Sequence, residues 1–172
     1  MYPLKNSQEN NELDLQQILK AADSAATAAS EVLMARFRPN SAEALDRFYK
    51  SPNALVTDAD LAADKAITEA LIAADAPGRI LSEESETKLS DDDSLTWLVD
   101  PLCGTVPFST GMDHWGVNIA LRKDGDLIAA SLPLPSLGER LSAIKANGVI
   151  RNGELFTGCS PIQKLSESAI GL

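Results

Sequence analysis

An aspartate at the end of an apolar segment is the first feature of the chain that could do chemistry. Asp100 follows the apolar run 97–99 and precedes a proline, and Gly104 and Thr105 come shortly after it. A carboxylate at a strand end can hold a metal cation, and the amides of a Gly-Thr pair can face an anion if a helix begins there. Cys103 stands among these oxygen donors, although a thiol is a soft ligand that suits magnesium poorly. The segment therefore predicts a metal-bound phosphate site with one irregular residue.

Other charged residues stand where they could join such a site. Asp58 and Asp60 open a predicted helix, and Glu83 follows the predicted short strand 79–82. Each also has an ordinary explanation, because acids are favourable in the first turn of a helix and common at solvated strand ends. Lys50, taken alone, is typical of a solvated surface. A catalytic role for any one of these residues is therefore a hypothesis that depends on the others.

Two other chemistries for Cys103 agree less well with the sequence. A cysteine phosphatase closes its phosphate loop with an arginine about six residues after the nucleophile, but the segment 104–109 contains none and the next arginine is Arg122. A zinc site needs several neighbouring ligands, yet His114 is the single histidine and Cys159 has no ligand-spaced partner. We therefore interpret His114 as a strand-edge residue and Cys159 as an ordinary small residue.

The N-terminal half is predicted to be mainly helical. Residues 13–37 are rich in alanine and place apolar side chains at near-helical spacing. Thr57 is the predicted N-cap of a second helix, and Asp60, three residues later, completes an aspartate version of the capping box. The segment 76–78, Ala-Pro-Gly, ends this helix, and residues 79–82 follow as a short strand.

The second half is predicted to consist of short strands joined by tight turns. The expected strands are 115–122, 127–132, 141–145 and 149–150. Turn sequences separate them at Lys123-Asp124-Gly125-Asp126, Asn147-Gly148 and Asn152-Gly153. Residues 41–49, between the two helices, are expected to form a short helical turn or a loop. Helices followed by an antiparallel meander indicate an α+β fold in which helices and sheet form layers.

Composition limits the classes of function. The 172 residues suit one domain, with 1–11 expected as a disordered tail and 12–172 as the folded part. The net charge of −10 disfavours binding to nucleic acid or to an anionic membrane. No apolar run approaches the ~18 residues of a membrane span. Because the N-terminal segment also lacks the apolar core of a signal peptide, we expect a cytoplasmic protein. Two cysteines are too few for a disulfide framework.

Taken together and in order, these segments resemble the inositol monophosphatase family, within the lithium-sensitive, magnesium-dependent phosphatases. The matching segments are Lys50-Ser51-Pro52, Val56-Thr57-Asp58-Ala59-Asp60, Leu81-Ser82-Glu83-Glu84-Ser85, 97–108 and 143–153. The resemblance implies the family's layered α/β/α/β/α sandwich, truncated after its first half, with the C-terminal α/β half absent. It also implies Mg²⁺ as cofactor, a small phosphorylated substrate such as an inositol phosphate, and a homodimer.

The resemblance also assigns catalytic and substrate-binding roles. It implies that Asp60, Glu83 and Thr105 are catalytic, with Thr105 and Asp60 polarising the attacking water and Glu83 helping to orient it. The implied substrate-binding residues are Lys50, Glu83, Leu102, Cys103, Gly104 and Thr105.

The implied metal ligands include one departure from the family pattern. They are Glu83, Asp100, the backbone carbonyl of Leu102 and the position of Cys103, where the family has an aspartate that binds a second metal. The family's last metal ligand, an aspartate in a Trp-Asp motif, has no counterpart, since Trp97 precedes a leucine and Trp115 a glycine.

Two functions of different class follow from this reading. The first is a metal-dependent phosphomonoesterase of the inositol monophosphatase type, which hydrolyses a small phosphorylated alcohol with a metal-activated water. The second is a non-catalytic relative that retains phosphate or metal binding, or the dimer surface. Within the first class, a 3′(2′),5′-bisphosphate nucleotidase is an alternative. Sugar bisphosphates and histidinol phosphate are also substrates of relatives, and the sequence leaves this choice open.

Overall fold

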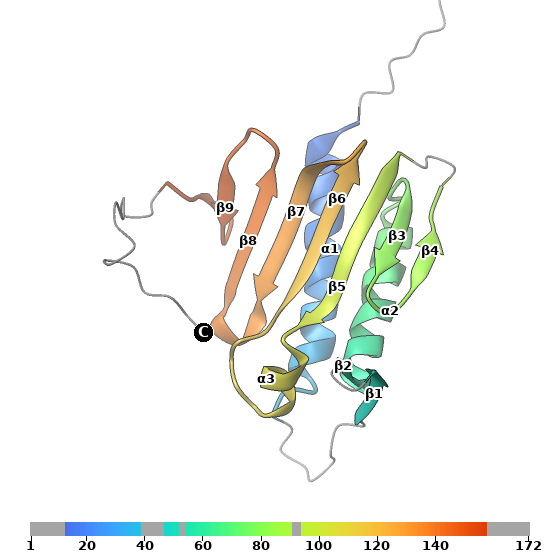
Figure 1. Cartoon of the computed structure of the whole chain (residues 1–172). Coiled ribbons are helices and arrows are strands. Elements are labelled where there is room, and N and C mark those ends of the chain that lie inside the picture. The colour runs from blue at the N-terminus through green and yellow to red at the C-terminus, as the bar shows by residue number, and fades with distance from the viewer. Residues whose placement is uncertain (1–12, 39–46, 52–53, 91–93, 158–172) are drawn as a thin grey trace, which may run out of the picture.

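Two long helices lie against one face of an eight-stranded sheet in the computed structural model, which describes residues 13–38, 47–51, 54–90 and 94–157 (Figure 1). The helices are α1 (Leu15–Met34), α2 (Asp58–Ala73), the short α3 (Thr105–Ser109) and a 3₁₀ turn, η1 (Pro135–Leu137). The strands are β1 (Arg47–Ser51), β2 (Ala54–Thr57), β3 (Arg79–Ser82), β4 (Glu86–Lys88), β5 (Leu95–Cys103), β6 (Gly116–Lys123), β7 (Asp126–Leu134), β8 (Glu139–Ile144), β9 (Val149–Arg151) and β10 (Glu154–Leu155).

The order of strands in the large sheet is β10-β9-β8-β7-β6-β5-β3-β4. Strands β5 to β10 form the antiparallel meander that the turn sequences predict. The exception to antiparallel pairing is between β3 and β5, which are parallel and pair Ser82 with Val99. Because parallel strands end at the same edge of a sheet, the segments that follow Ser82 and Val99 emerge side by side.

The helix α1 packs closely because its buried face is mostly alanine. Asp14 caps its first turn by accepting hydrogen bonds from the amides of Gln16 and Gln17. Ala22, Ala25, Ala26 and Ala29 are completely buried where α1 meets α2 and the sheet. Small side chains let the backbones approach, and the larger core residues Leu33, Ile67, Leu71 and Trp97 fill the remaining space.

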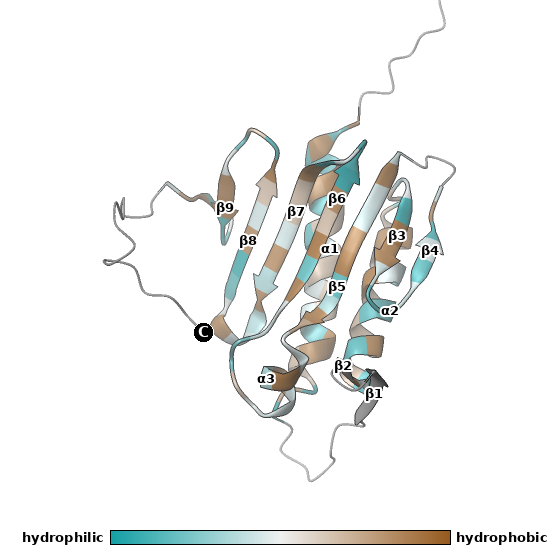
Figure 2. Cartoon of the chain, viewed as in Figure 1, coloured by the Kyte–Doolittle hydropathy of each residue, from teal (hydrophilic) through white to brown (hydrophobic). Residues whose placement is uncertain are grey.

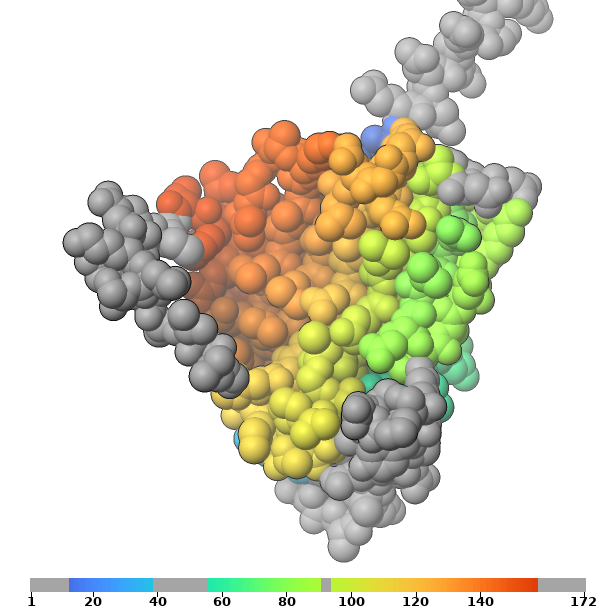
Figure 3. Space-filling view, in the orientation of Figure 1, coloured from blue at the N-terminus to red at the C-terminus, as the bar shows by residue number. Residues whose placement is uncertain are grey.

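Side chains on the central strands alternate between the helix-covered face and the other face. Leu95, Trp97 and Val99 of β5 join the core with Val117 and Ile119 of β6. The alternation is visible as changes of hydropathy along the strands (Figure 2). In the described part of the chain no helix covers the opposite face, which is the one seen in Figure 3. The expected α+β fold of helix and sheet layers is confirmed, with one helix layer and one sheet layer described.

Some of the expected elements differ from the structure. Residues 47–49 are not a helical turn or loop, because they belong to β1, whose Arg47 pairs with Thr57 of β2 in a hairpin. His114 is exposed and precedes β6 in a loop, so it is not at a strand edge. The expected tail 1–11, residues 41–46 and Cys159 lie outside the described residues. No helix in the described ranges is long and apolar enough to cross a membrane.

Candidate active site

The parallel pairing of β3 and β5 brings two acidic residues to one edge of the sheet. Glu83 follows β3 directly, and its amide donates a hydrogen bond of 3.0 Å to the carbonyl of Val99. Asp100 comes next after Val99 in β5 and lies opposite Asn118 of β6. Glu83 and Asp100 are therefore neighbours at the end of the sheet, although they are 17 positions apart in the sequence.

A buried carboxylate at the start of α2 forms the second part of the site. Asp60 is 3% exposed, and its Oδ2 accepts hydrogen bonds from the Thr57 amide at 2.8 Å and the Thr57 hydroxyl at 2.6 Å. This is the predicted capping box, and it is confirmed. The other oxygen, Oδ1, accepts a hydrogen bond of 3.0 Å from the Thr105 hydroxyl. Asp60 thus joins the first turn of α2 to the start of α3.

A left-handed glycine turns the chain from β5 into α3. Gly104 has φ +97°, and a Cβ at this position would lie 2.7 Å from the carbonyl oxygen of His114. The Thr105 hydroxyl also lies 3.2 Å from the Leu102 carbonyl, so this turn is closed on itself. Phe108 of α3 packs edge-on against Trp115, with ring centroids 4.9 Å apart. The glycine and the aromatic pair together fix the position of Thr105.

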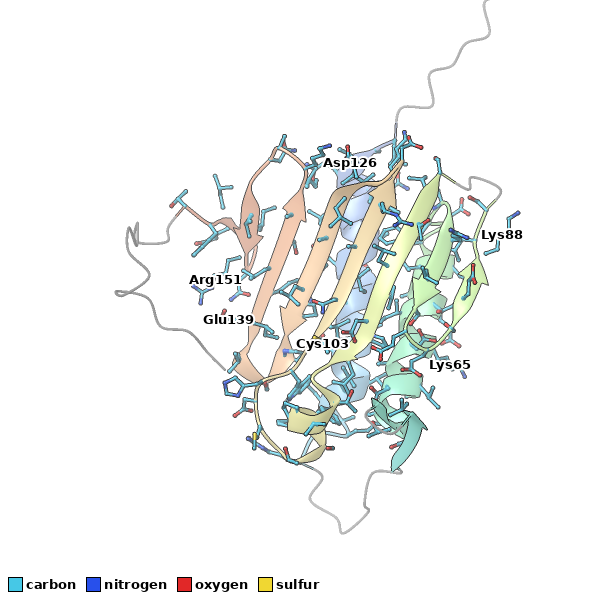
Figure 4. The ribbon with its side chains drawn as sticks, viewed as in Figure 1. Lys65, Lys88, Cys103, Asp126, Glu139 and Arg151 are labelled. Atoms are coloured by element: carbon cyan, nitrogen blue, oxygen red, sulfur yellow. The ribbon has the colours of Figure 1, made fainter. Side chains whose placement is uncertain are left out.

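The Cys103 thiol lies beside the acidic residues, at the α3 end of the sheet (Figure 4). Burial around the sulfur raises the pKa of this thiol above its usual value, although the residue as a whole is exposed. The charge of Asp100 and a hydrogen bond to it raise the pKa further, and the more distant charge of Glu83 adds to this. A hydrogen bond with Asn118 acts in the opposite direction. At neutral pH the side chain is therefore an uncharged thiol.

The structure brings most of the expected site residues into two adjoining groups. One group contains Asp60, Thr105 and the Leu102 carbonyl, which share hydrogen bonds. The other contains Glu83, Asp100 and Cys103. Gly104 joins them, since it lies between Cys103 and Thr105. The backbone of Lys50 lies in β1, but its side chain is outside the described part of the structure.

Sequence reasoning did not include two contacts of the site. The Asn118 side chain contacts the Cys103 sulfur, and Asn118 is a polar break in the largely apolar first part of β6. That break was visible in the sequence, but only the register of β5 against β6 places it opposite Asp100. The Thr57 hydroxyl is the other, because it donates to the Asp60 carboxylate as well as capping α2.

Comparison with known proteins decides the family. A family model described as the inositol monophosphatase family matches residues 14–170 of the chain. The chain belongs to the inositol monophosphatase family. The resemblance predicted from the acidic segments is thereby confirmed, and the match extends through both helices and the whole meander of the described sheet.

The alignments with individual known proteins cover a larger share of this chain than of those proteins. A Streptomyces griseus protein named glucose-1-phosphate thymidylyltransferase is 35% identical over 67% of this chain and 45% of its own length. Inositol-1-monophosphatase from Rhizobium meliloti is 32% identical over 71% of this chain and 46% of its own. The structure of the extragenic suppressor protein suhB from Bartonella henselae has a TM-score of 0.73 at 29% identity. The match covers 80% of this chain and 53% of the Bartonella henselae chain. The chain spans about half the length of these relatives.

In this member of the inositol monophosphatase family, the ligand atoms beside Asp100 are oxygens, the atom type that suits one hard cation. Asp100 Oδ1 is buried and has no hydrogen-bond partner among the described residues, which is costly for a carboxylate unless a cation or water satisfies it. Glu83 and the Leu102 carbonyl supply further oxygen, the donor type that magnesium prefers. The uncharged Cys103 thiol does not fit a second magnesium ion. Within the described ranges, no three Asp, Glu, His or Cys side chains are grouped closely enough to hold a metal as they stand.

Proposed function

We propose that this chain is part of a metal-dependent phosphomonoesterase that releases phosphate from a small phosphorylated alcohol. The observation that carries the proposal is the hydrogen bond of 3.0 Å between the Thr105 hydroxyl and buried Asp60, beside the acidic strand ends of β3 and β5. A polarised hydroxyl next to oxygen ligands is the arrangement needed to activate water against a phosphate. Membership of the inositol monophosphatase family supports the same reaction class.

Asp60 and Thr105 would act together on the attacking water. The Thr105 hydroxyl has one proton, which it donates toward Asp60 Oδ1 or the Leu102 carbonyl. Its oxygen lone pairs are then directed away from these acceptors and can accept a hydrogen bond from water. If the proton of this water passed to Thr105, the proton of Thr105 would pass to Asp60 Oδ1. Asp60 is held by Thr57 on its other oxygen, so it cannot turn away from Thr105. General-base assistance of this kind contributes about 10²–10⁴ in rate.

Glu83, Asp100 and the Leu102 carbonyl would hold Mg²⁺ at the edge of the sheet. When bound there, the ion would supply charge neutralisation for the phosphate and lower the pKa of a bound water. The amides of Gly104 and Thr105 would face the phosphate, and Glu83 would also help to orient the water. Lys50 would contribute positive charge at the edge of the site. The proposal includes a homodimer, which the family resemblance implies, and a cytoplasmic location, which the polar N-terminal segment predicts.

The proposal is tested by phosphate release from inositol monophosphate by the complete gene product, with and without Mg²⁺. We expect turnover that requires Mg²⁺ and that falls by at least about 10²-fold in the Asp60→Asn variant, which removes the charged partner of Thr105. Adenosine 3′,5′-bisphosphate, assayed in parallel, distinguishes a nucleotidase from an inositol phosphatase. Mg²⁺-independent turnover, or none with any of these substrates, would contradict the proposal.

A second candidate function is a non-catalytic relative that binds phosphate or metal. The uncharged Cys103 thiol favours it, because this side chain cannot supply the charge that an aspartate gives to a second metal ion. The Bartonella henselae protein is named an extragenic suppressor protein, and that name states no enzymatic activity. Binding of inorganic phosphate and Mg²⁺ to a protein without turnover would favour this second function.

A further inference from the structure

A second buried carboxylate lies one turn after Asp60 on the same face of α2. Asp64 is 8% exposed, and its Oδ2 accepts a hydrogen bond of 2.7 Å from the Ser85 hydroxyl. Residues four apart on a helix project from the same side, so both carboxylates face the sheet end that carries the candidate site. Asp64 differs from Asp60 in its contacts, because within the described part of the chain it caps no helix and its side chain accepts one hydrogen bond, from a residue 21 positions later.

Ser85 belongs to the short turn that presents Glu83. Its carbonyl accepts a hydrogen bond of 2.8 Å from the Ser82 amide, which closes the turn after β3. The Glu83 amide bonds to the Val99 carbonyl of β5 at 3.0 Å, and the Glu84 amide bonds to the Ser82 hydroxyl at 3.3 Å. The turn is therefore attached to β5 on one side and, through Ser85, to α2 on the other.

We propose that Asp64 is a positioning residue that sets the location of Glu83 in the site. The inference rests on the proposed function, because it assumes that Glu83 is a metal ligand. The helix α2 then holds both parts of the site, with Asp60 bound to Thr105 and Asp64 bound to Ser85. Since the two carboxylates are fixed on one rigid helix, they fix the distance between the hydroxyl of Thr105 and the turn that carries Glu83.

Stability alone gives a poor account of this carboxylate. Asp64 Oδ1 is buried, and no residue in the described ranges forms a hydrogen bond with it. A buried polar oxygen without a partner costs free energy, and an apolar residue would avoid this cost among the neighbouring core residues Ala63 and Ile67. The one strong contact that Asp64 makes is to Ser85, so holding the turn is the role that its contacts support.

The experiment compares Asp64→Ala, Ser85→Ala, the double variant and Asp64→Asn in the complete protein. Each is measured by amide hydrogen exchange, by calorimetric titration with Mg²⁺, and by kcat and KM on inositol monophosphate. Glu69→Ala is the matched control, because Glu69 is on the exposed face of α2 and pairs with exposed Lys65. Melting temperature is recorded for every variant, so that global unfolding is recognised.

We expect Asp64→Ala to weaken Mg²⁺ binding by about tenfold, the lower end of the range for residues that orient a metal ligand. Protection of amides 82–86 should fall, while KM for the substrate changes little. Ser85→Ala should do the same, and the double variant should add nothing. Asp64→Asn should restore both properties, since its amide oxygen can still accept from Ser85.

Unchanged exchange of amides 82–86 in Asp64→Ala would overturn the proposal. So would lost protection with unaltered Mg²⁺ affinity, because the turn would then move without affecting the ligand. If the wild-type protein neither binds Mg²⁺ nor releases phosphate, the proposed function fails and Asp64 has no metal ligand to position. If the wild-type protein is active and the variants alone are normal, only the role of Asp64 is wrong.

Discussion

The Thr105 hydroxyl lies 3.0 Å from Asp60 Oδ1, although the two residues are 45 positions apart in the chain. Asp60 is buried and also accepts from the amide and hydroxyl of Thr57. Three donors therefore converge on one carboxylate that has little contact with solvent. Because little water reaches this carboxylate, the arrangement is directional, and the acceptors of the Thr105 hydroxyl are Asp60 Oδ1 and the Leu102 carbonyl.

This contact predicts different effects for two substitutions of Thr105. Thr105→Val keeps the size of the side chain and removes the hydroxyl, so we expect kcat to fall by about 10²-fold or more. Thr105→Ser keeps the hydroxyl and should retain most activity. The control is Thr110→Val, which removes a hydroxyl that bonds only to the Val106 and Pro107 carbonyls at the end of α3. Steady-state phosphate release checks the prediction, and equal activity of Thr105→Val and wild type would contradict it.

Gly104→Ala is predicted to destabilise the fold beyond the cost of its backbone conformation. The left-handed φ of +97° costs an alanine about 1–2 kcal/mol, and the new Cβ would crowd the His114 carbonyl at 2.7 Å. Gly125→Ala is the matched control, because Gly125 has φ +93° and no atom within 4 Å of its Cβ position. The free energy of unfolding in urea should fall more for Gly104→Ala. Equal losses would show that the contact with His114 contributes nothing.

The local features of this fold could be predicted from the sequence, because neighbouring residues determine them. The capping box of Thr57 and Asp60 is formed by residues three apart, and the strand 79–82 and the turn at Gly125 have similarly short signals. The β1–β2 hairpin was missed, because residues 41–49 were expected to form a short helical turn or a loop.

The geometry of the candidate site depended on contacts between distant residues. The parallel pairing of β3 with β5 places Glu83 next to Asp100, and nothing in either segment alone indicates this pairing. The family resemblance supplied the expectation that these acids share a site. Asn118 had no such support, because its contact with Cys103 follows from the exact register of β6 against β5.

Cys103→Asp is predicted to strengthen Mg²⁺ binding by about tenfold or more, the size of effect seen when the surroundings of a metal ligand change. The substitution replaces a soft, uncharged thiol beside Asp100 with a hard, charged ligand. Cys103→Ser is the control, because it introduces a hard oxygen without charge and should change affinity much less. Calorimetric titration measures all three proteins. Equal Mg²⁺ affinities for Cys103→Asp and wild type would show that this side chain is outside the metal site. Cd²⁺ should show the reverse order, since it prefers thiols.

The Cys103 thiol is predicted to react slowly with iodoacetamide at neutral pH despite its exposure. Burial around the sulfur and the nearby Asp100 raise its pKa above 9.0, so the reactive thiolate forms only as the pH rises past that value. The raised pKa of Cys103 also affects the free energy of unfolding. Its contribution to stability is fully present below the pKa of the unfolded chain and is lost as the pH rises through the pKa of the folded protein. A Cys159→Ser background confines alkylation to Cys103, and mass spectrometry follows its rate from pH 7 to about 10. Asp100→Asn removes a charge that raises the pKa, so its reaction at pH 8 should be faster. A rate midpoint below pH 9, or an unchanged rate in Asp100→Asn, would mean that Asp100 does not control this thiol.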